Sequence, residues 1–370
     1  MIRRGSRPTP SDASAEPSSD CSGPAAALTV YHDDMPAAPR QVLVTGASGF
    51  LGSHLVAALA GQGVTVRAQG RARERMPSGA GVTPVVTALD DVGALTAAAR
   101  GCAAIVHAAA LSAPWGSRAD FIAANVAGTA NVLAAARAAG VRRLVHISSP
   151  AVLFDGRDQH GLSDDAPVPP RLTSQYARTK LQAETLVRAA GNAGLEVVTL
   201  RPKAIYGAGD RALVPRLLAA AHAGRLPQVG DGRNAVDVTH VDDVVQAIQC
   251  ALVTESGVGS TFLITGGEHV PLWTMIRTLL EGVGLRYPSR VLPLPLVLAA
   301  AGAMEALAAV TGREPSLTRY SALILARTQT YDITRARTVL GYAPRVRVAD
   351  GVARTIDALR RASRVSMIPA

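Results

Sequence analysis

A tyrosine and a lysine stand four residues apart in the stretch TSQYARTKLQAE, at Tyr176 and Lys180. The stretch has a helical pattern, so this spacing places both side chains on one face of the helix. A phenol ordinarily keeps its proton up to about pH 10, and a neighbouring ammonium favours the phenolate. We therefore expect Lys180 to lower the pKa of Tyr176, so that the phenol can exchange a proton with a bound ligand.

Lysine is rare in this chain, which makes its presence beside Tyr176 informative. Of the 38 lysine and arginine residues, only Lys180 and Lys203 are lysine. The planar guanidinium of arginine does not give up its proton, so arginine is a poor substitute for a compact charge that relays one. The alternative is a surface tyrosine that merely has a charged neighbour on the helix.

Two serines end an expected strand in the stretch HISSPAV. Open α/β sheets bind ligands at the carboxyl ends of their parallel strands. We expect Ser149 to donate a hydrogen bond to a substrate oxygen that becomes negative, and we prefer it to its neighbour Ser148. The alternative is a polar strand end that caps a turn.

The glycine-rich loop GASGFLG lies between the first expected strand and the first expected helix. Its glycines would permit a tight turn, a close approach of backbone N–H groups to a pyrophosphate, and close packing of helix against strand. The helix N-terminus adds a partial positive charge. The alternative is a βα turn without a ligand. The loop residues that we expect to contact a dinucleotide are Gly46, Ser48, Gly49, Phe50, Leu51 and Gly52.

The second expected strand, VTVRA, is followed by arginines rather than by an acid. An NAD site usually has an acid at the end of that strand to bind the ribose 2′-hydroxyl. No acid occurs between Gly52 and Glu74, and a guanidinium can pair with a 2′-phosphate. We therefore favour NADP(H), with Arg71 as its ligand. NAD(H) bound beside a solvated arginine loop is the alternative.

Short apolar runs alternate with amphipathic helical stretches along most of the chain. This alternation predicts an α/β fold, a Rossmann-type doubly wound parallel sheet with a smaller, mostly helical C-terminal substrate lobe. Helices are expected over 50–63, 121–140, 174–194 and 239–252. Strands are expected over 41–46, 64–68, 84–89, 103–110, 143–149, 195–202 and 260–267.

Composition suggests how the chain is divided. Residues 1–39 are rich in Pro, Ser and Ala and are predicted to be a disordered tail, with Met35 as an alternative start. The remaining parts are a dinucleotide-binding domain over 40–202 plus 238–268, a substrate lobe over 203–237 plus 269–350, and a C-terminal tail over 351–370.

Charge and cysteine usage limit the partners of the chain. The formal net charge is +10, but aromatic residues are only 4% and no dense basic run is interleaved with them. We therefore expect no nucleic-acid partner. Cys21, Cys102 and Cys250 form neither a CxxC motif nor a zinc-like spacing. This predicts no metal site and a reduced, cytoplasmic compartment.

The segment 291–310 is almost entirely apolar. Two prolines near its start and Glu305 within it weaken a membrane-spanning interpretation. We expect a helix that is buried or faces the substrate. Peripheral contact with a membrane and a true span are the alternatives.

The chain resembles the extended short-chain dehydrogenase/reductase family, which includes NAD-dependent epimerases and dehydratases. The stretches that carry the resemblance are VTGASGFLG, VHAAA, ISSPAV, YARTK, LRPKAIYGAGD and VGDGRNAVDVTHVDD. The resemblance implies that Ser149, Tyr176 and Lys180 are catalytic and that Asn125 supports the active site. It also implies a homodimer. The further cofactor contacts that it implies are Ala108, Ala109, Pro202, Tyr176 and Lys180. The chain departs from the family at Ala88, where relatives often have an aspartate near the adenine.

RPKAIYGAGD followed by VDVTHVDD resembles the 3β-hydroxysteroid dehydrogenase branch. The chain also resembles bacterial 2-alkyl-3-oxoalkanoate reductases in the stretches SAPWGS and DRALVPRL and in its apolar C-terminal segment. The resemblance implies NAD(P)H-dependent reduction of a ketone, or oxidation of the alcohol, on a small hydrophobic substrate such as a 2-alkyl-3-oxoalkanoate. Arg216 or Arg233 could hold its carboxylate.

Three other functions remain open. A sterol or 3β-hydroxysteroid dehydrogenase is the first alternative. A nucleotide-sugar epimerase or dehydratase is less favoured, because the expected substrate lobe is apolar. A non-catalytic NADP-binding protein is disfavoured by the Tyr176 and Lys180 pair.

Overall fold

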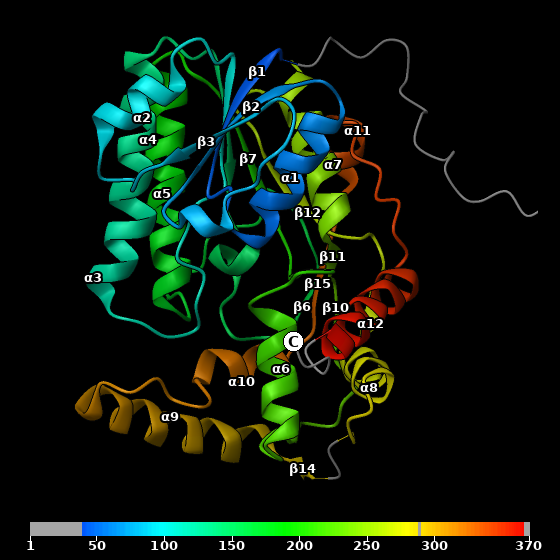
Figure 1. Cartoon of the computed structure of the whole chain (residues 1–370). Coiled ribbons are helices and arrows are strands. Elements are labelled where there is room, and N and C mark those ends of the chain that lie inside the picture. The colour runs from blue at the N-terminus through cyan, green and yellow to red at the C-terminus, as the bar shows by residue number, and fades with distance from the viewer. Residues whose placement is uncertain (1–38, 288–289, 366–370) are drawn as a thin grey trace, which may run out of the picture. The chain divides into compact units, whose positions relative to one another are not determined.

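Seven parallel strands form the central sheet of the computed structural model, which describes residues 39–287 and 290–365 (Figure 1). The strand order is β12-β7-β5-β4-β1-β2-β3, and it reverses between β1 and β4. The predicted doubly wound sheet is therefore confirmed, and each expected strand has its counterpart. The strands are β1 (Gln41–Thr45), β2 (Thr65–Gly70), β3 (Val82–Val86), β4 (Ala104–His107), β5 (Arg143–Ile147), β7 (Glu196–Pro202) and β12 (Thr261–Ile264).

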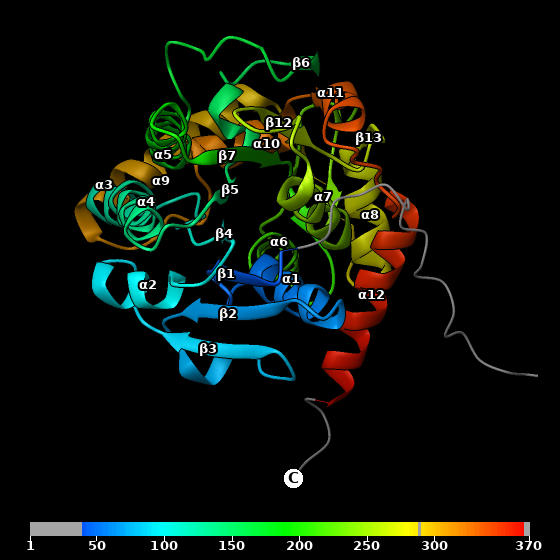
Figure 2. The ribbon, with the colours of Figure 1, turned by 90° about the horizontal axis from the view of Figure 1, so that it is seen from above.

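Helices cover both faces of this sheet, as Figures 1 and 2 show. The apolar cores on the two faces explain the arrangement, because the strands are buried on both sides. One face is covered by α1 (Phe50–Gly61) and α7 (Val241–Val253), and α11 (Thr334–Thr338) packs beside β12. The other face is covered by α2 (Val92–Ala99), α4 (Gly128–Ala138) and α5 (Gln175–Asn192), and α3 (Arg118–Phe121) leads into a π-helical segment, Ile122–Ala127. Short 3-10 helices span Arg73–Arg75 and Pro150–Leu153.

The substrate lobe combines helices with very short strands around two further apolar clusters. Its helices are α6 (Leu213–His222), α8 (Leu272–Gly282), α9 (Leu294–Thr311), α10 (Arg319–Ala326) and α12 (Val348–Val365). A small sheet has the order β13 (Val270–Pro271), β10 (Ala235–Val236), β15 (Gln329–Tyr331) and β6 (Gln159–Leu162). Two strand pairs complete the fold: β11 (Thr239–His240) with β8 (Ile205–Tyr206), and β14 (Val291–Leu292) with β9 (Gln228–Val229).

The C-terminal expectation was wrong. Most of the segment predicted as a tail over 351–370 belongs to helix α12, whose Val352 and Ile356 are buried beside Leu279 of α8. These apolar residues recur at helical spacing, which is why the segment packs instead of extending into solvent. The predicted N-terminal tail and the alternative start at Met35 lie outside the described residues. The described residues form one compact unit.

Helix α9 also differs from expectation. Only 17% of the helix is buried inside the protein, which contradicts the expectation of a buried helix. The other half of that expectation, a helix that faces the substrate, stays a prediction. This helix and the segment Arg118–Ala138 are long and apolar enough to cross a membrane by length and composition alone. The second of them covers the sheet, as described above.

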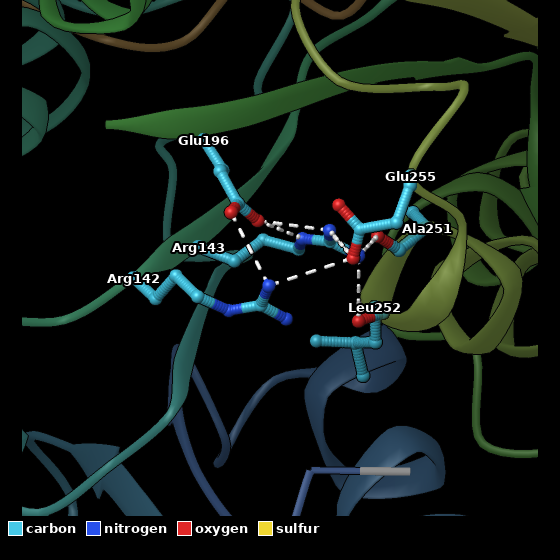
Figure 3. A network of polar contacts seen from close by, with 6 residues as sticks. All are labelled: Arg142, Arg143, Glu196, Ala251, Leu252 and Glu255. Carbon is cyan, nitrogen blue, oxygen red and sulfur yellow. Dashed lines mark hydrogen bonds and ion pairs between the residues drawn. The ribbon is translucent and has the colours of Figure 1, made fainter. Parts of the chain in front are cut away.

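Arg143 anchors the end of the sheet where strands β5 and β7 begin (Figure 3). Its guanidinium is 1% exposed and lies 2.8 Å from a carboxylate oxygen of Glu196 and 2.7 Å from one of Glu255. It also donates to the carbonyl oxygen of Leu252 in the last turn of α7, at 2.9 Å. One cation thus ties two strands to the negative end of a helix.

We expect Arg143→Met to lower the free energy of unfolding by about 3 kcal/mol, because it leaves Glu196 and the α7 carbonyls without their buried partner. The matched control is Arg142→Met, since Arg142 contacts the same two acids but is 61% exposed. That change should cost less than about 1 kcal/mol. Urea denaturation of both variants measures the difference. Equal losses would contradict the assigned role of Arg143.

Candidate active site

The glycine loop has the shape that a dinucleotide requires. Gly46 has φ +72°, and a Cβ added there would lie 2.7 Å from the Cα of Ala109. A Cβ on Gly52 would collide with the carbonyl oxygen of Gly46. Gly49 is the N-cap of α1, so the helix N-terminus is left without a covering side chain. The loop therefore fits a pyrophosphate, which backbone N–H groups can approach closely.

A glutamine at the end of β2 holds the loop in place. The Oε1 atom of Gln69 accepts a hydrogen bond from Gly46 N at 3.2 Å, and its Nε2 atom donates to the carbonyl of Thr87 at 2.5 Å. Gln69 is 2% exposed. In an NAD site an acid at the end of this strand would bind the ribose, whereas Gln69 supports the glycine loop instead. We did not predict this residue, although its position at a strand end was a usable signal.

Arg71, just past the end of β2, is the arginine most suited to a 2′-phosphate. It is exposed and makes no hydrogen bond or ion pair with the residues that the structure describes. Arg67, by contrast, donates to the carbonyl oxygens of Ala98 and Arg100 at 2.8 Å and 2.7 Å, which caps the end of α2. Arg67 is therefore occupied elsewhere.

The other predicted loop residues also lie at this turn. Phe50 and Leu51 begin α1, and the Phe50 ring contacts the ring of His54 edge-on at 5.2 Å. The carbonyl oxygen of Ser48 accepts a hydrogen bond from Arg211 at 3.2 Å. Arg211 was not predicted. It brings a cation to the phosphate loop from the start of the substrate lobe.

The structure brings Tyr176 together with Ser149. Tyr176 lies in the first turn of α5, which Ser174 caps by accepting a hydrogen bond from Ala177 N at 3.1 Å. The hydroxyls of Ser149 and Ser112 both lie near enough to Tyr176 to act on its pKa. Ser148 is instead buried, and its hydroxyl has no partner among the described residues.

Ser112 is the site residue that the sequence interpretation missed. It follows β4, at the carboxyl edge of the sheet, in the stretch AAALSAPWGS. Its position is equivalent to that of Ser149 after β5, and the argument that found Ser149 would have found it too. Two hydroxyls from neighbouring strands therefore face one phenol.

The pKa of Tyr176 differs from our expectation. Burial raises it above its ordinary value, while the hydroxyls of Ser149 and Ser112 act to lower it. The predicted lowering by Lys180 is absent, because the lysine is directed elsewhere. Tyr176 therefore holds its proton throughout the neutral range, which is the state required of a general acid.

Lys180 lies beneath the site with its charge almost fully desolvated. It is 2% exposed, and its Nζ atom donates to the carbonyl oxygen of Ile147 at 2.6 Å. Burial lowers its pKa to about 8, and Glu184 opposes the shift. Glu184 is itself held by Arg201 at 2.7 Å. The pKa of Lys180 is therefore close enough to neutral pH for its ammonium group to lose its proton at a mildly alkaline pH.

Asn125 connects the β4 loop to the catalytic helix. Its Oδ1 atom accepts from Leu111 N at 2.7 Å, and its Nδ2 atom donates to the carbonyl of Leu111 and to Thr179 Oγ1, both at 3.1 Å. Leu111 immediately precedes Ser112, and Thr179 precedes Lys180. Asn125 thus positions both sides of the site without touching the phenol.

A buried network supports Asn125 from within the sheet. The hydroxyl of Thr129 donates to the carbonyl of Asn125 at 2.6 Å, so it must accept from Nε2 of His107, at 3.0 Å. The Nδ1 atom of His107 is then free to accept from Thr45 Oγ1 at 2.7 Å. Burial, together with the charge of Lys180, lowers the pKa of His107 to about 3. A neutral histidine therefore links β1, β4 and α4.

Backbone strain marks the end of β7. Pro202, a predicted cofactor contact, is the last residue of that strand and is buried. Two residues later Ala204 has φ +44°, the only positive φ at a residue other than glycine within the described ranges. Such strain persists only where the surroundings enforce it, and it is common at ligand sites. Ala108 and Ala109, the other predicted contacts, lie beside the glycine loop.

The residues expected to hold a carboxylate are not gathered at the site. Arg216 pairs with Glu314 at 3.2 Å, with both side chains about half exposed, and Arg233 is exposed. Asp91, near the departure at Ala88, caps α2 by accepting from Ala94 N at 2.8 Å. A carboxylate-binding role for Arg216 or Arg233 therefore stays a prediction.

The chain belongs to the NAD dependent epimerase/dehydratase family, whose model matches residues 42–264. The resemblance seen in the motifs is thereby confirmed at the level of the family.

Several characterised proteins are similar over nearly the whole chain. A 4-hydroxy-2-methyl-3-oxo-4-farnesyl-3,4-dihydroquinoline-1-oxide ketoreductase from Stigmatella aurantiaca is 37% identical, over 87% of this chain and 96% of its own length. A 2-alkyl-3-oxoalkanoate reductase from Stenotrophomonas maltophilia is 36% identical over 85% and 98%. A sterol-4-alpha-carboxylate 3-dehydrogenase from Homo sapiens is 30% identical over 88% and 90%. Among solved structures, MoeE5 in complex with UDP-glucuronic acid and NAD is 29% identical over 87% and 99%, with a TM-score of 0.68.

The two adjacent serines provide a test of the site. We expect Ser149→Ala to lower kcat by about 100-fold, because it removes a donor to the developing oxyanion. Ser148→Ala is the matched control and should leave kcat nearly unchanged, since the Ser148 hydroxyl has no partner among the described residues. Steady-state kinetics and cofactor titration measure both. A comparable loss of cofactor affinity in Ser149→Ala would indicate a structural role.

Proposed function

We propose that this protein is a nicotinamide-dependent ketoreductase that acts on a hydrophobic ketone, with a 2-alkyl-3-oxoalkanoate as the first candidate. The observation that carries the proposal is the phenol of Tyr176, which burial keeps protonated and which has the hydroxyls of Ser149 and Ser112 near it. The similarity to reductases of 3-oxo compounds supports the same reaction class.

In the reductive direction, the chain's own residues supply a proton and hold the substrate oxygen. When bound, the dinucleotide supplies the hydride. Tyr176 would donate its proton to the carbonyl oxygen as that oxygen becomes an alkoxide. Ser149 would donate a hydrogen bond to the same oxygen, and Ser112 would hold the phenol or the substrate from the opposite loop. Lys180, whose Nζ atom donates to the carbonyl oxygen of Ile147, would contact the nicotinamide ribose.

The names of the similar proteins suggest one chemical feature of the substrate. They include a 2-alkyl-3-oxoalkanoate, a 2-methyl-3-oxo compound and a sterol-4-alpha-carboxylate 3-dehydrogenase. Each name places an oxygen function beside a substituted carbon. We therefore infer that the substrate carries its ketone next to a branched carbon. A sterol dehydrogenase is the second candidate, because the third of these proteins is similar over most of both chains.

The substrate class can be tested with purified protein. NADPH and NADH oxidation should be measured with a 2-alkyl-3-oxoalkanoate, a 3-ketosteroid and a UDP-sugar. The proposal expects the first to have the highest kcat/KM. Turnover of the UDP-sugar alone would overturn it.

We infer that the cofactor is NADP(H), although the comparisons support a nicotinamide dinucleotide only in general. The support is Arg71, an exposed guanidinium at the end of β2 without an acid nearby. We expect Arg71→Ala to lower kcat/KM for NADPH about 10- to 100-fold and to leave the value for NADH unchanged, since one charge-assisted contact is lost. Arg67→Ala is the control and should not change this ratio. A wild-type preference for NADH would refute the assignment.

We further propose that the protein is cytoplasmic and forms a homodimer. The support for a dimer is a hollow between residues of α3 and α5, including Arg118 and Gln182. Light scattering of the purified protein should give the mass of a dimer. The mass of a monomer at micromolar concentration would contradict the proposal.

A further inference from the structure

Helix α9 presents an outward face that carries no polar side chain. Leu296, Leu307 and Val310 are 57%, 63% and 86% exposed. With the exposed alanines between them they recur every three or four residues, so they form one stripe along the helix. We call this the α9 stripe; its residues are Leu296, Ala299, Ala300, Ala303, Ala306, Leu307 and Val310. Exposed apolar surface of this kind marks an interaction site.

The opposite face of α9 is anchored to the substrate lobe. Val297 is buried against Trp273 and Ile276 of α8. Glu305, the only charged residue of the helix, turns toward α10 and pairs with Arg319 at 2.7 Å. If α9 crossed a membrane, its contacts with α8 and α10 would have to separate. If α9 lies along a membrane surface, these contacts are kept. The stripe is thus available to an external partner while the helix stays in place.

Arginines lie at both ends of the stripe. Arg286 and Arg290 precede α9, and Arg313 follows it. All three are exposed, and none has an ion-pair partner within the part of the chain that the structure describes. The nearby acid Glu314 is already paired with Arg216. An apolar stripe between unpaired cations complements a surface with an apolar interior and anionic head groups.

We propose that the α9 stripe docks on an anionic lipid bilayer, with the helix lying in the interface and the flanking arginines among the head groups. This partner goes beyond the function proposed above and does not depend on the identity of the substrate. Leu296, Leu307 and Val310 enter the acyl boundary, and Arg290 and Arg313 contact lipid phosphates. Figure 1 shows α9 at the edge of the lobe, with α10 beside it.

The position of α10 links this surface to the active site. Helix α9 packs along α10, and Tyr320 of α10 contacts the ring of Phe154, near Ser149, at 6.4 Å between centroids. Tyr320 is also near enough to Tyr176 for their charges to interact. Helix α10 therefore contacts α9 and also carries a side chain that lies near the phenol.

Flotation with lipid vesicles tests the proposal directly. Wild-type protein should float with vesicles of phosphatidylcholine and phosphatidylglycerol, bind weakly to phosphatidylcholine alone, and be released at high salt. The triple variant Leu296→Glu, Leu307→Glu, Val310→Glu should reduce the bound fraction at least about tenfold. Arg290→Gln with Arg313→Gln should remove the preference for anionic vesicles. Val168→Glu is the matched control, since Val168 is an exposed valine outside α9.

Other results would overturn the proposal. Failure of the wild-type protein to bind anionic vesicles would do so, as would equal binding by the triple variant. A lipid-free triple variant that is monomeric while the wild type is dimeric, with no vesicle binding by either, would assign the stripe to a second copy instead. Turnover of a water-soluble short-chain ketone should be the same in all these variants, so a failure of docking can be told apart from a failure of the proposed reaction.

Discussion

Replacement of Tyr176 by phenylalanine is expected to lower kcat for ketone reduction by about a thousandfold, since the proton donor is lost. Binding of the dinucleotide should change little, because the glycine loop and Arg71 are untouched. The proton is held where the reaction needs it, since burial raises the pKa of Tyr176 and two serine hydroxyls lie near the phenol.

The matched control for this change is Tyr331→Phe. Tyr331 is also buried, and its hydroxyl has no hydrogen-bond partner among the described residues. Removal of that hydroxyl should leave kcat within about threefold of wild type, as expected for a site away from the chemistry. Single-turnover kinetics and fluorescence titration of the dinucleotide measure both variants. A Tyr176→Phe enzyme with substantial turnover would remove the phenol from the mechanism.

The second large effect is expected from Lys180→Arg, which keeps the charge but should lower kcat/KM by about 100-fold or more. Lys180 is 2% exposed, and its Nζ atom donates to the carbonyl oxygen of Ile147 at 2.6 Å. A planar guanidinium cannot take that place or give up a proton. Retention of most activity would contradict the role of this residue.

Lys203 provides the matched control, because it is the only other lysine and has a similar environment. It is buried, and its Nζ atom donates to Gln329 Oε1 at 2.6 Å. Burial lowers its pKa to about 8, as for Lys180. Lys203 joins the end of β7 to the small sheet of the substrate lobe. Lys203→Arg should therefore lower the melting temperature while leaving kcat of the folded protein within about threefold.

The depressed pKa of Lys180 also has a kinetic consequence. The charged form predominates below about pH 8 and is lost as the pH rises through that value. Tyr176 stays protonated over the same interval, because its pKa is raised. We therefore expect kcat/KM for the dinucleotide, which reports the free enzyme, to fall above about pH 8. A flat profile up to pH 10 would show that the Lys180 charge does not contribute.

The sheet could be predicted from the sequence because each strand is a short apolar run followed by a turn or helix signal. The alternation of strands and helices also indicates which strand ends meet, so the sequence alone places Ser149 and the glycine loop at one edge of the sheet. The very short strands of the substrate lobe could not be predicted, because two to four residues are too few to show a period. Helix α12 was assigned to a tail outside the substrate lobe, although Val352 and Ile356 show helical spacing and pack with that lobe.

The chemistry of the site was only partly readable from the sequence. Tyr176, Ser149 and Lys180 could be named from residue type and spacing. The direction of the pKa shift at Tyr176 could not, because it depends on burial and on Ser112, which reaches the phenol from another strand. The neutral state of His107 likewise depends on burial and on the charge of Lys180, which comes from a distant part of the sequence. Helix α9 was misjudged because its composition fits a buried helix equally well.

The most direct test of the account is the oxidation of NADPH by wild-type protein in the presence of a 2-alkyl-3-oxoalkanoate, measured in parallel with Tyr176→Phe. The account predicts stoichiometric formation of the 3-hydroxy product by the wild type and a rate about a thousandfold lower for the variant. Equal rates for the two proteins, or no reduction of any ketone by the wild type, would contradict it.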